Sequence, residues 1–174
     1  MSLKSINPAT GQALKEYALH TLEAVEQKLA LATEVFRSWR NTPFAVRADH
    51  MGRAAEILRD RADHWGEIMA REVGKPITQG RAEAKKCAWV CDYYAEHAVE
   101  FLQNDLVGTD ADLSYVRYEP LGPVLAIMPW NYPFWQVFRF AAPGLMAGNV
   151  GLLSHAPNVP ECALAIEEIF TEAG

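Results

Sequence analysis

The chain has 174 residues, of which 50% are apolar and 22% are charged, and its formal net charge is −6. This length and apolar content predict one globular domain with its own core, and the dispersed charges argue against disorder. The acidic balance argues against nucleic acid as a partner, because phosphate binding requires clustered Lys and Arg side chains.

The first elements of the chain are predicted to be a hairpin and a helix. Residues 7–11 carry Asn, Pro and Gly in a turn pattern between two short apolar stretches, 3–6 and 13–17, which predicts a small hairpin. Thr21 can cap the helix that follows. Apolar residues recur in this helix at helical spacing until the Asn-Thr-Pro break at 41–43.

Two longer helices are predicted next. The second helix runs from about residue 44 to 72, and the Gly-Lys-Pro sequence at 74–76 ends it. The third helix is expected over residues 77–106. Residues 1–107 are therefore expected to be mainly helical.

The last third of the chain alternates strands and helices. Residues 113–118 and 150–153 have strand patterns, and residues 124–128 are predicted to form a buried strand. Helices are expected over 134–146 and 160–173. This alternation predicts parallel strands joined by right-handed crossovers, with ligands bound beyond the carboxyl ends of the strands.

The candidate ligand loops are therefore residues 128–131 and 154–158. In the first loop, Pro129 and Pro133 fix the backbone on either side of Asn131. A preorganised side-chain amide at this point can donate a hydrogen bond to a developing oxyanion. The alternative is that Asn131 satisfies the turn through hydrogen bonds to its own backbone.

Residues 119–134, Glu-Pro-Leu-Gly-Pro-Val-Leu-Ala-Ile-Met-Pro-Trp-Asn-Tyr-Pro-Phe, closely resemble a segment of the aldehyde dehydrogenase superfamily. The turn at 7–11, Glu-Val-Gly-Lys-Pro at 72–76 and Ala-Gly-Asn at 147–149 resemble further landmarks of that family in the same order. The resemblance implies an α/β fold, the N-terminal portion of the aldehyde dehydrogenase fold, with long helices followed by an incomplete Rossmann-like parallel sheet. It implies a single incomplete domain, in which residues 108–174 begin the nicotinamide-dinucleotide-binding β-α-β-α unit.

The resemblance also implies roles for the first loop. Asn131 matches the Asn that holds the carbonyl oxygen of the substrate, and Tyr132 beside it is expected to contact the substrate, a small-molecule aldehyde. The wall that faces the nicotinamide ring is expected to consist of Ile127, Met128, Pro129 and Trp130.

Arg139 is the only charged residue between Asn131 and His155. An Arg at this spacing resembles the pattern of succinate-semialdehyde dehydrogenases, in which it binds the distal carboxylate of the substrate. A guanidinium suits that role, because its forked donors match carboxylate geometry. The alternatives are an Arg that extends to the surface or pairs with a structural carboxylate.

Ser154 departs from the family pattern, in which most members carry Lys at this cofactor-binding position. Losing that cation is expected to weaken NADP binding more than NAD binding, because the additional phosphate loses an ionic partner. Members that prefer NAD often have an acidic residue three positions later, where this chain has Pro157. The expected cofactor is NAD or NADP, with the preference open.

No catalytic or metal-binding role is expected for the cysteines and histidines. Cys87 and Cys91 share a helix face but lack further metal ligands, so no metal is expected, and the histidines are expected to be surface or capping residues. The three cysteines fit free thiols in a reducing compartment. No secretory signal and no apolar run of about 20 residues occurs, so we expect a cytoplasmic protein that does not enter a membrane.

Three functional hypotheses remain. The thiolate and the carboxylate base of the family normally lie beyond the length of this chain, which covers roughly the first third of a typical member. The chain is then a fragment of an NAD(P)-dependent aldehyde dehydrogenase that is inactive alone, a half-site complemented by a separate chain, or a non-catalytic binding protein. An unpaired sheet edge and exposed apolar helix faces would favour self-association.

Overall fold

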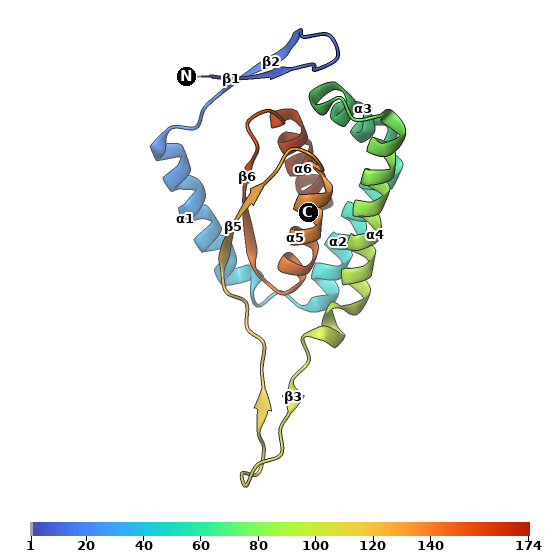
Figure 1. Ribbon diagram of the computed structural model, residues 1–174. Coiled ribbons are helices and arrows are strands. Elements are labelled where there is room, and N and C mark those ends of the chain that lie inside the picture. The colour runs from blue at the N-terminus through green and yellow to red at the C-terminus, as the bar shows by residue number, and fades with distance from the viewer. Residues whose placement is uncertain (1) are drawn as a thin grey trace.

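The computed structural model describes residues 2–174, and it packs helices around a two-stranded parallel sheet (Figure 1). One hairpin lies at one end of the molecule and a thin two-stranded arm extends from the other end. Among the described residues, no helix is long and apolar enough to cross a bilayer. The elements in chain order are β1 (Ser2–Ile6), β2 (Ala13–Ala18), α1 (Leu22–Trp39), α2 (Phe44–Asp60), α3 (Ala62–Val73), α4 (Ile77–Phe101), β3 (Asp105–Leu106), β4 (Tyr115–Val116), β5 (Pro123–Met128), α5 (Trp135–Met146), β6 (Val150–His155) and α6 (Pro160–Ala173).

The predicted hairpin and first helix are confirmed. Strands β1 and β2 pair antiparallel around a turn in which Asn7 Oδ1 accepts a hydrogen bond from the Ala9 N–H at 2.9 Å. Gly11 has a φ of 71° in this turn, a conformation that glycine adopts at low cost. Thr21 Oγ1 accepts a hydrogen bond from the Ala24 N–H at 3.2 Å and so caps α1 as predicted.

The single helix predicted over residues 44–72 is wrong, because the chain breaks at Arg61 into α2 and α3. Arg61 has φ −107° and ψ 25°, outside the helical region. Its guanidinium pairs with Glu168 at 2.8 Å and also with Glu172, both on α6. No Gly or Pro marks the break, and the residue at which it occurs is tied to α6 by both ion pairs.

The stop after α3 is confirmed, because Gly74 adopts the left-handed conformation with a φ of 67°. Helix α4 ends at Phe101, five residues before the predicted end, and the chain at Asp105 pairs with β4 instead. Helices α3 and α4 approach each other closely at two glycines, Gly66 and Gly80. A Cβ added to Gly80 would lie 2.9 Å from Gly66 Cα.

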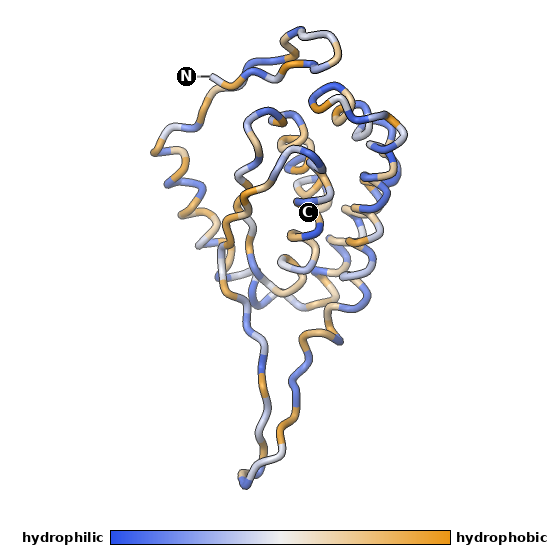
Figure 2. The backbone as a smooth tube through the Cα atoms, viewed as in Figure 1, coloured by the Kyte–Doolittle hydropathy of each residue, from blue (hydrophilic) through white to orange (hydrophobic). Residues whose placement is uncertain are grey.

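The hydrophobic core lies where α2, α3 and α4 meet α5 and α6. Figure 2 shows polar and apolar residues alternating along these helices, as expected for helices with one buried face. Fully buried side chains come from all five helices and include Leu58, Trp65, Met69, Cys87, Cys91, Phe138, Met146, Cys162 and Ile169.

The predicted β-α-β-α order of the last third is confirmed, with β5 and β6 parallel and α5 and α6 following them. The strand predicted over 113–118 shrinks to the two residues of β4. The prediction that β5 is buried is wrong. Leu125 and Ile127 are 62% and 75% exposed, and within β5 only Ala126 is buried, because alternate side chains of a strand point to opposite faces.

Candidate active site

The parallel pairing of β5 and β6 brings the two predicted ligand loops together. Met128 is paired with His155, and Ile127 with Ser154. Both strands therefore end at the same edge, and residues 129–133 and 156–159 leave that edge side by side. This is where an open parallel sheet binds its ligands.

His155 connects the two loops, although the sequence suggested only a surface or capping role for it. Its Nδ1 accepts a hydrogen bond from the Ala156 N–H, and its Nε2 lies 2.9 Å from the Pro133 carbonyl oxygen. In the neutral tautomer that fits these two contacts, Nδ1 accepts from the Ala156 N–H and Nε2 donates to the Pro133 carbonyl oxygen. Burial lowers the pKa of His155 and favours this neutral form.

A buried carboxylate caps the helix that follows the first loop. Glu83 of α4 is 4% exposed, and its Oε1 accepts hydrogen bonds from the N–H groups of Phe134 and Trp135, each at 2.9 Å. Its other oxygen, Oε2, pairs with Lys75 Nζ. The same ammonium lies 3.7 Å from the centre of the Tyr132 ring, within cation–π range.

A second buried carboxylate caps the helix that follows the second loop. Glu72 of α3 is 3% exposed and accepts hydrogen bonds from the N–H groups of Glu161 at 2.9 Å and Cys162 at 2.8 Å. The Ser5 hydroxyl of β1 donates to the same carboxylate at 2.7 Å. Helix N-termini carry unpaired amides and a partial positive charge, so both carboxylates satisfy otherwise orphaned donors.

Most residues of the predicted oxyanion and cofactor set lie on this edge with exposed side chains, whereas Met128 is half-buried against the core. Ile127 is 75% exposed, Trp130 53% and Tyr132 49%. Asn131 and Ser154 are also exposed, and neither side chain makes a hydrogen bond within the described part of the chain. The turn role considered for Asn131 would require such a bond to its own backbone.

Arg139 lies on α5 with its side chain exposed. Within residues 2–174 it forms no ion pair, as is also true of the exposed Arg37 on α1, whereas Arg53, Arg59 and Arg71 on α2 and α3 each pair with a carboxylate. The alternative in which Arg139 pairs with a structural carboxylate therefore has no support among the described residues.

None of the three cysteines is an exposed thiol. Cys87, Cys91 and Cys162 are buried and unpaired, and burial raises the pKa of each thiol above its ordinary value. A thiol in this state is protonated at neutral pH and cannot act as a nucleophile.

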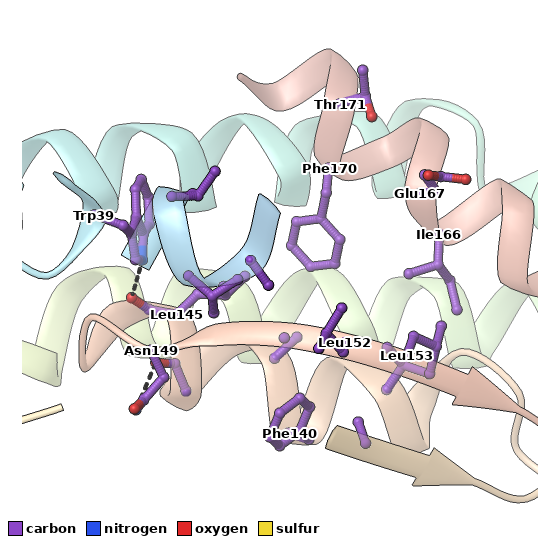
Figure 3. A pocket seen from close by; sticks show the side chains of 18 of the residues that line it. Trp39, Phe140, Leu145, Asn149, Leu152, Leu153, Ile166, Glu167, Phe170 and Thr171 are labelled. Atoms are coloured by element: carbon purple, nitrogen blue, oxygen red, sulfur yellow. Dashed lines mark hydrogen bonds between the residues drawn. The ribbon is translucent and has the colours of Figure 1, made fainter. Parts of the chain in front are cut away.

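The structure has two hollows in this region, and only the smaller one touches the predicted ligand loops. A groove of about 660 Å³ between α1, α5, β6 and α6 is lined mainly by apolar side chains, including Trp39, Phe140, Leu152 and Phe170, and by none of the predicted site residues (Figure 3). A smaller hollow of about 440 Å³ is lined by Trp130 and Asn158 together with β1, so it touches both loops.

Sequence reasoning missed the supporting residues Lys75, Glu83, Glu72 and His155. Their signal was weak, because a single Glu inside an otherwise ordinary helix reads as part of its solvated face. Only the tertiary structure places these carboxylates at the ends of helices 51 to 90 residues away along the chain.

Comparison with known proteins gives consistent results. A probable NADP(+) succinate-semialdehyde dehydrogenase of Synechocystis is 56% identical over this whole chain, which spans 38% of that relative. The Escherichia coli succinate semialdehyde dehydrogenase Sad, named for NAD(P)+, is 44% identical over 98% of the chain and 37% of its own length. The crystal structure of a Streptococcus pyogenes succinic semialdehyde dehydrogenase with NADP+ superposes with a TM-score of 0.95 at 34% identity, over 99% of this chain and 38% of that one.

The resemblance inferred from the sequence is thus confirmed along the full chain, and the chain spans less than two fifths of the relatives that it matches. The structural match covers the helices and the β-α-β-α unit alike, which confirms the predicted fold class. Because the model of the aldehyde dehydrogenase family matches residues 1–174, the chain belongs to that family and corresponds to the amino-terminal part of its fold.

Proposed function

We propose that this chain supplies the oxyanion-binding and nicotinamide-facing part of an NAD(P)-dependent aldehyde oxidation site, with succinate semialdehyde as the substrate. The observation that supports this most directly is the exposed, unbonded side chain of Asn131. It lies in a loop whose ends are fixed by β5 and by the capped start of α5.

Asn131 is suited to hold the aldehyde oxygen. When a nucleophile adds to the carbonyl carbon, negative charge develops on that oxygen, and the Asn131 amide can donate a hydrogen bond to it. Two prolines restrict the loop, so this donor is preorganised and needs little rearrangement during the reaction.

The residues around Asn131 fit a dinucleotide. Ile127 and Trp130 present exposed apolar surface at the carboxyl end of β5, as a flat aromatic ring requires. Ser154 offers an uncharged hydrogen-bonding group on the neighbouring strand. The bound nicotinamide accepts the hydride in this chemistry, and the residues of this chain bind and orient it.

The attacking thiolate is not one of the cysteines of this chain, since all three are buried with raised pKa values. The proposed site therefore requires a thiolate and a general base from further polypeptide. We expect no aldehyde-dependent formation of NAD(P)H by the 174 residues alone, and any such activity would contradict the proposal.

Arg139 is proposed to bind the distal carboxylate of the substrate, because it is an exposed guanidinium without a protein partner on the helix that follows the Asn131 loop. The names of the relatives from Synechocystis and E. coli point to the same substrate.

These roles are tested in a complete relative into which residues 1–174 have been built. Asn131→Ala should lower kcat about 10²- to 10³-fold, the usual effect of removing one oxyanion donor. The control is Asn104→Ala, which alters an exposed Asn at the base of the β3–β4 arm. Equal activities of the two variants would remove Asn131 from the mechanism.

Substrate and cofactor preferences are tested in the same protein. Arg139→Gln should reduce kcat/KM for succinate semialdehyde but not for an uncharged aldehyde, whereas Arg37→Gln, an exposed arginine on α1, should change neither. Ser154→Lys should lower KM for NADP more than for NAD. An unchanged preference for carboxylated aldehydes in the Arg139 variant would refute the substrate assignment.

A further inference from the structure

We propose that Lys75 and Glu83 form a buried ion pair that positions the Asn131 loop for catalysis. Neither side chain is expected to touch substrate or cofactor. This inference rests on the proposed function, since it concerns the placement of the oxyanion donor, and it identifies the residues that control that placement.

Glu83 fixes the end of the loop. Its Oε1 accepts both the Phe134 and the Trp135 N–H groups, which are the first free amides of α5. Glu83 belongs to α4, so these two hydrogen bonds attach the start of α5 to a different helix. The other end of the loop is fixed at Met128 by its pairing with β6.

Asn131 lies three residues from each of these fixed points, at 128 and 134. Pro129 and Pro133 lock two φ angles within that short span. A displacement of the start of α5 therefore also moves the side-chain amide of Asn131.

Lys75 acts on the same loop in two ways. Its Nζ pairs with Glu83 Oε2, and the two side chains are only 8% and 2% exposed. The same Nζ lies 3.7 Å from the centre of the Tyr132 ring, next to Asn131. Lys75 directly follows Gly74, the residue in the left-handed conformation that ends α3. A defined backbone turn, and not a flexible surface segment, therefore sets the position of the Lys75 ammonium.

The pair is interdependent because it is buried. If either partner is removed, the other remains a buried charge without its counter-ion, which is strongly unfavourable. Removing both charges leaves a neutral acceptor at the start of α5. The double variant Lys75→Met/Glu83→Gln should therefore be at least as stable as the less stable of the two single variants.

Glu72 provides an internal control. It is buried to the same degree as Glu83 and caps α6 in the same manner, through the amides of Glu161 and Cys162. Glu72→Gln should cost similar stability, but the helix that it releases follows the Ser154 loop. Its kinetic effect should fall on KM for the dinucleotide.

The first experiment uses the 174-residue chain and measures hydrogen exchange by mass spectrometry. Glu83→Gln and Lys75→Met should accelerate exchange at the amides of Phe134 and Trp135 and leave those of Glu161 and Cys162 protected. Glu72→Gln should give the reverse pattern. Because Gln retains a carbonyl oxygen that can accept these amides, Glu83→Ala removes the acceptor altogether, and unchanged exchange at Phe134 and Trp135 in Glu83→Ala would overturn the capping role.

The second experiment measures kinetics in the complete relative that carries these residues. Glu83→Gln should lower kcat about 10- to 100-fold with little change in KM for the aldehyde, as expected for a small misplacement of a catalytic donor. Lys75→Arg, which retains the charge, should recover activity relative to Lys75→Met.

Equal losses of kcat in Glu83→Gln and Glu72→Gln at equal stability would show that the pair is merely structural. Asn131→Ala separates the two proposals. If that variant is impaired but Glu83→Gln is not, the positioning inference fails alone, and if Asn131→Ala is fully active, the proposed function itself fails.

Discussion

The contact between Gly66 and Gly80 makes a quantitative prediction for the packing of α3 on α4. In Gly80→Ala, the new Cβ would lie 2.9 Å from Gly66 Cα and 3.0 Å from the Gly66 carbonyl oxygen. Both are backbone atoms, so the two helices must separate. Gly52 on α2 is a matched control, because a Cβ there meets nothing within 4 Å.

Both substitutions gain the same intrinsic helix propensity, about 1 kcal/mol in favour of Ala. The difference between the variants therefore isolates the packing term, for which overpacking typically costs about 1–3 kcal/mol. Gly52→Ala should be stabilised, and Gly80→Ala should be less stable than Gly52→Ala by that amount. For a chain of this size, each kcal/mol corresponds to roughly 2–4 °C in Tm.

Urea unfolding followed by circular dichroism measures both free energies of unfolding, with the m-value as a check that the unfolding transition is unchanged. Thermal melts provide a second measurement on the same samples. If the two Ala variants shift stability equally and in the same direction, the close approach of α3 and α4 at Gly80 is refuted.

Three further predictions follow from other features. Burial holds the folded-state pKa of His155 below the ordinary value of 6.5, so its contribution to stability is complete above pH 6.5 and is lost as the pH falls through the folded-state pKa. The variant His155→Gln should flatten this part of the pH–stability curve. An unchanged curve would refute the burial of a neutral His155. Cys87, Cys91 and Cys162 should react with a thiol reagent only at the rate of unfolding, and rapid labelling of native protein would contradict their burial. The exposed apolar side chains of α1 and β5 should cause concentration-dependent self-association in analytical ultracentrifugation, whereas a monomer at every concentration would count against it.

Features set by neighbouring residues were predictable from the sequence. The hairpin turn, the Thr21 cap, the Gly74 stop and the β-α-β-α order all depend on residues within one or two turns of each other, and all are confirmed. The meeting of the two ligand loops was also predictable, because parallel strands bring their carboxyl ends to one edge.

Features set by distant residues were not predictable. The break at Arg61 involves carboxylates on α6 more than 100 residues away, and no local breaker announces it. The contact of Gly66 with Gly80 joins two helices, and nothing next to either glycine in the sequence indicates it. The exposure of β5 depends on which elements cover each face of the sheet, and an apolar run of five residues does not contain that information.

The two buried glutamates separate the placement of the loops from the chemistry of their side chains. Both carboxylates hold backbone amides, so they fix the starts of α5 and α6, the helices that follow the two loops, without using the side chain of Asn131 or Ser154. Residues on the loops can then be exchanged with little penalty to folding. Under the proposed function, cofactor or substrate preference would change by single substitutions on these loops, which the variant Ser154→Lys tests.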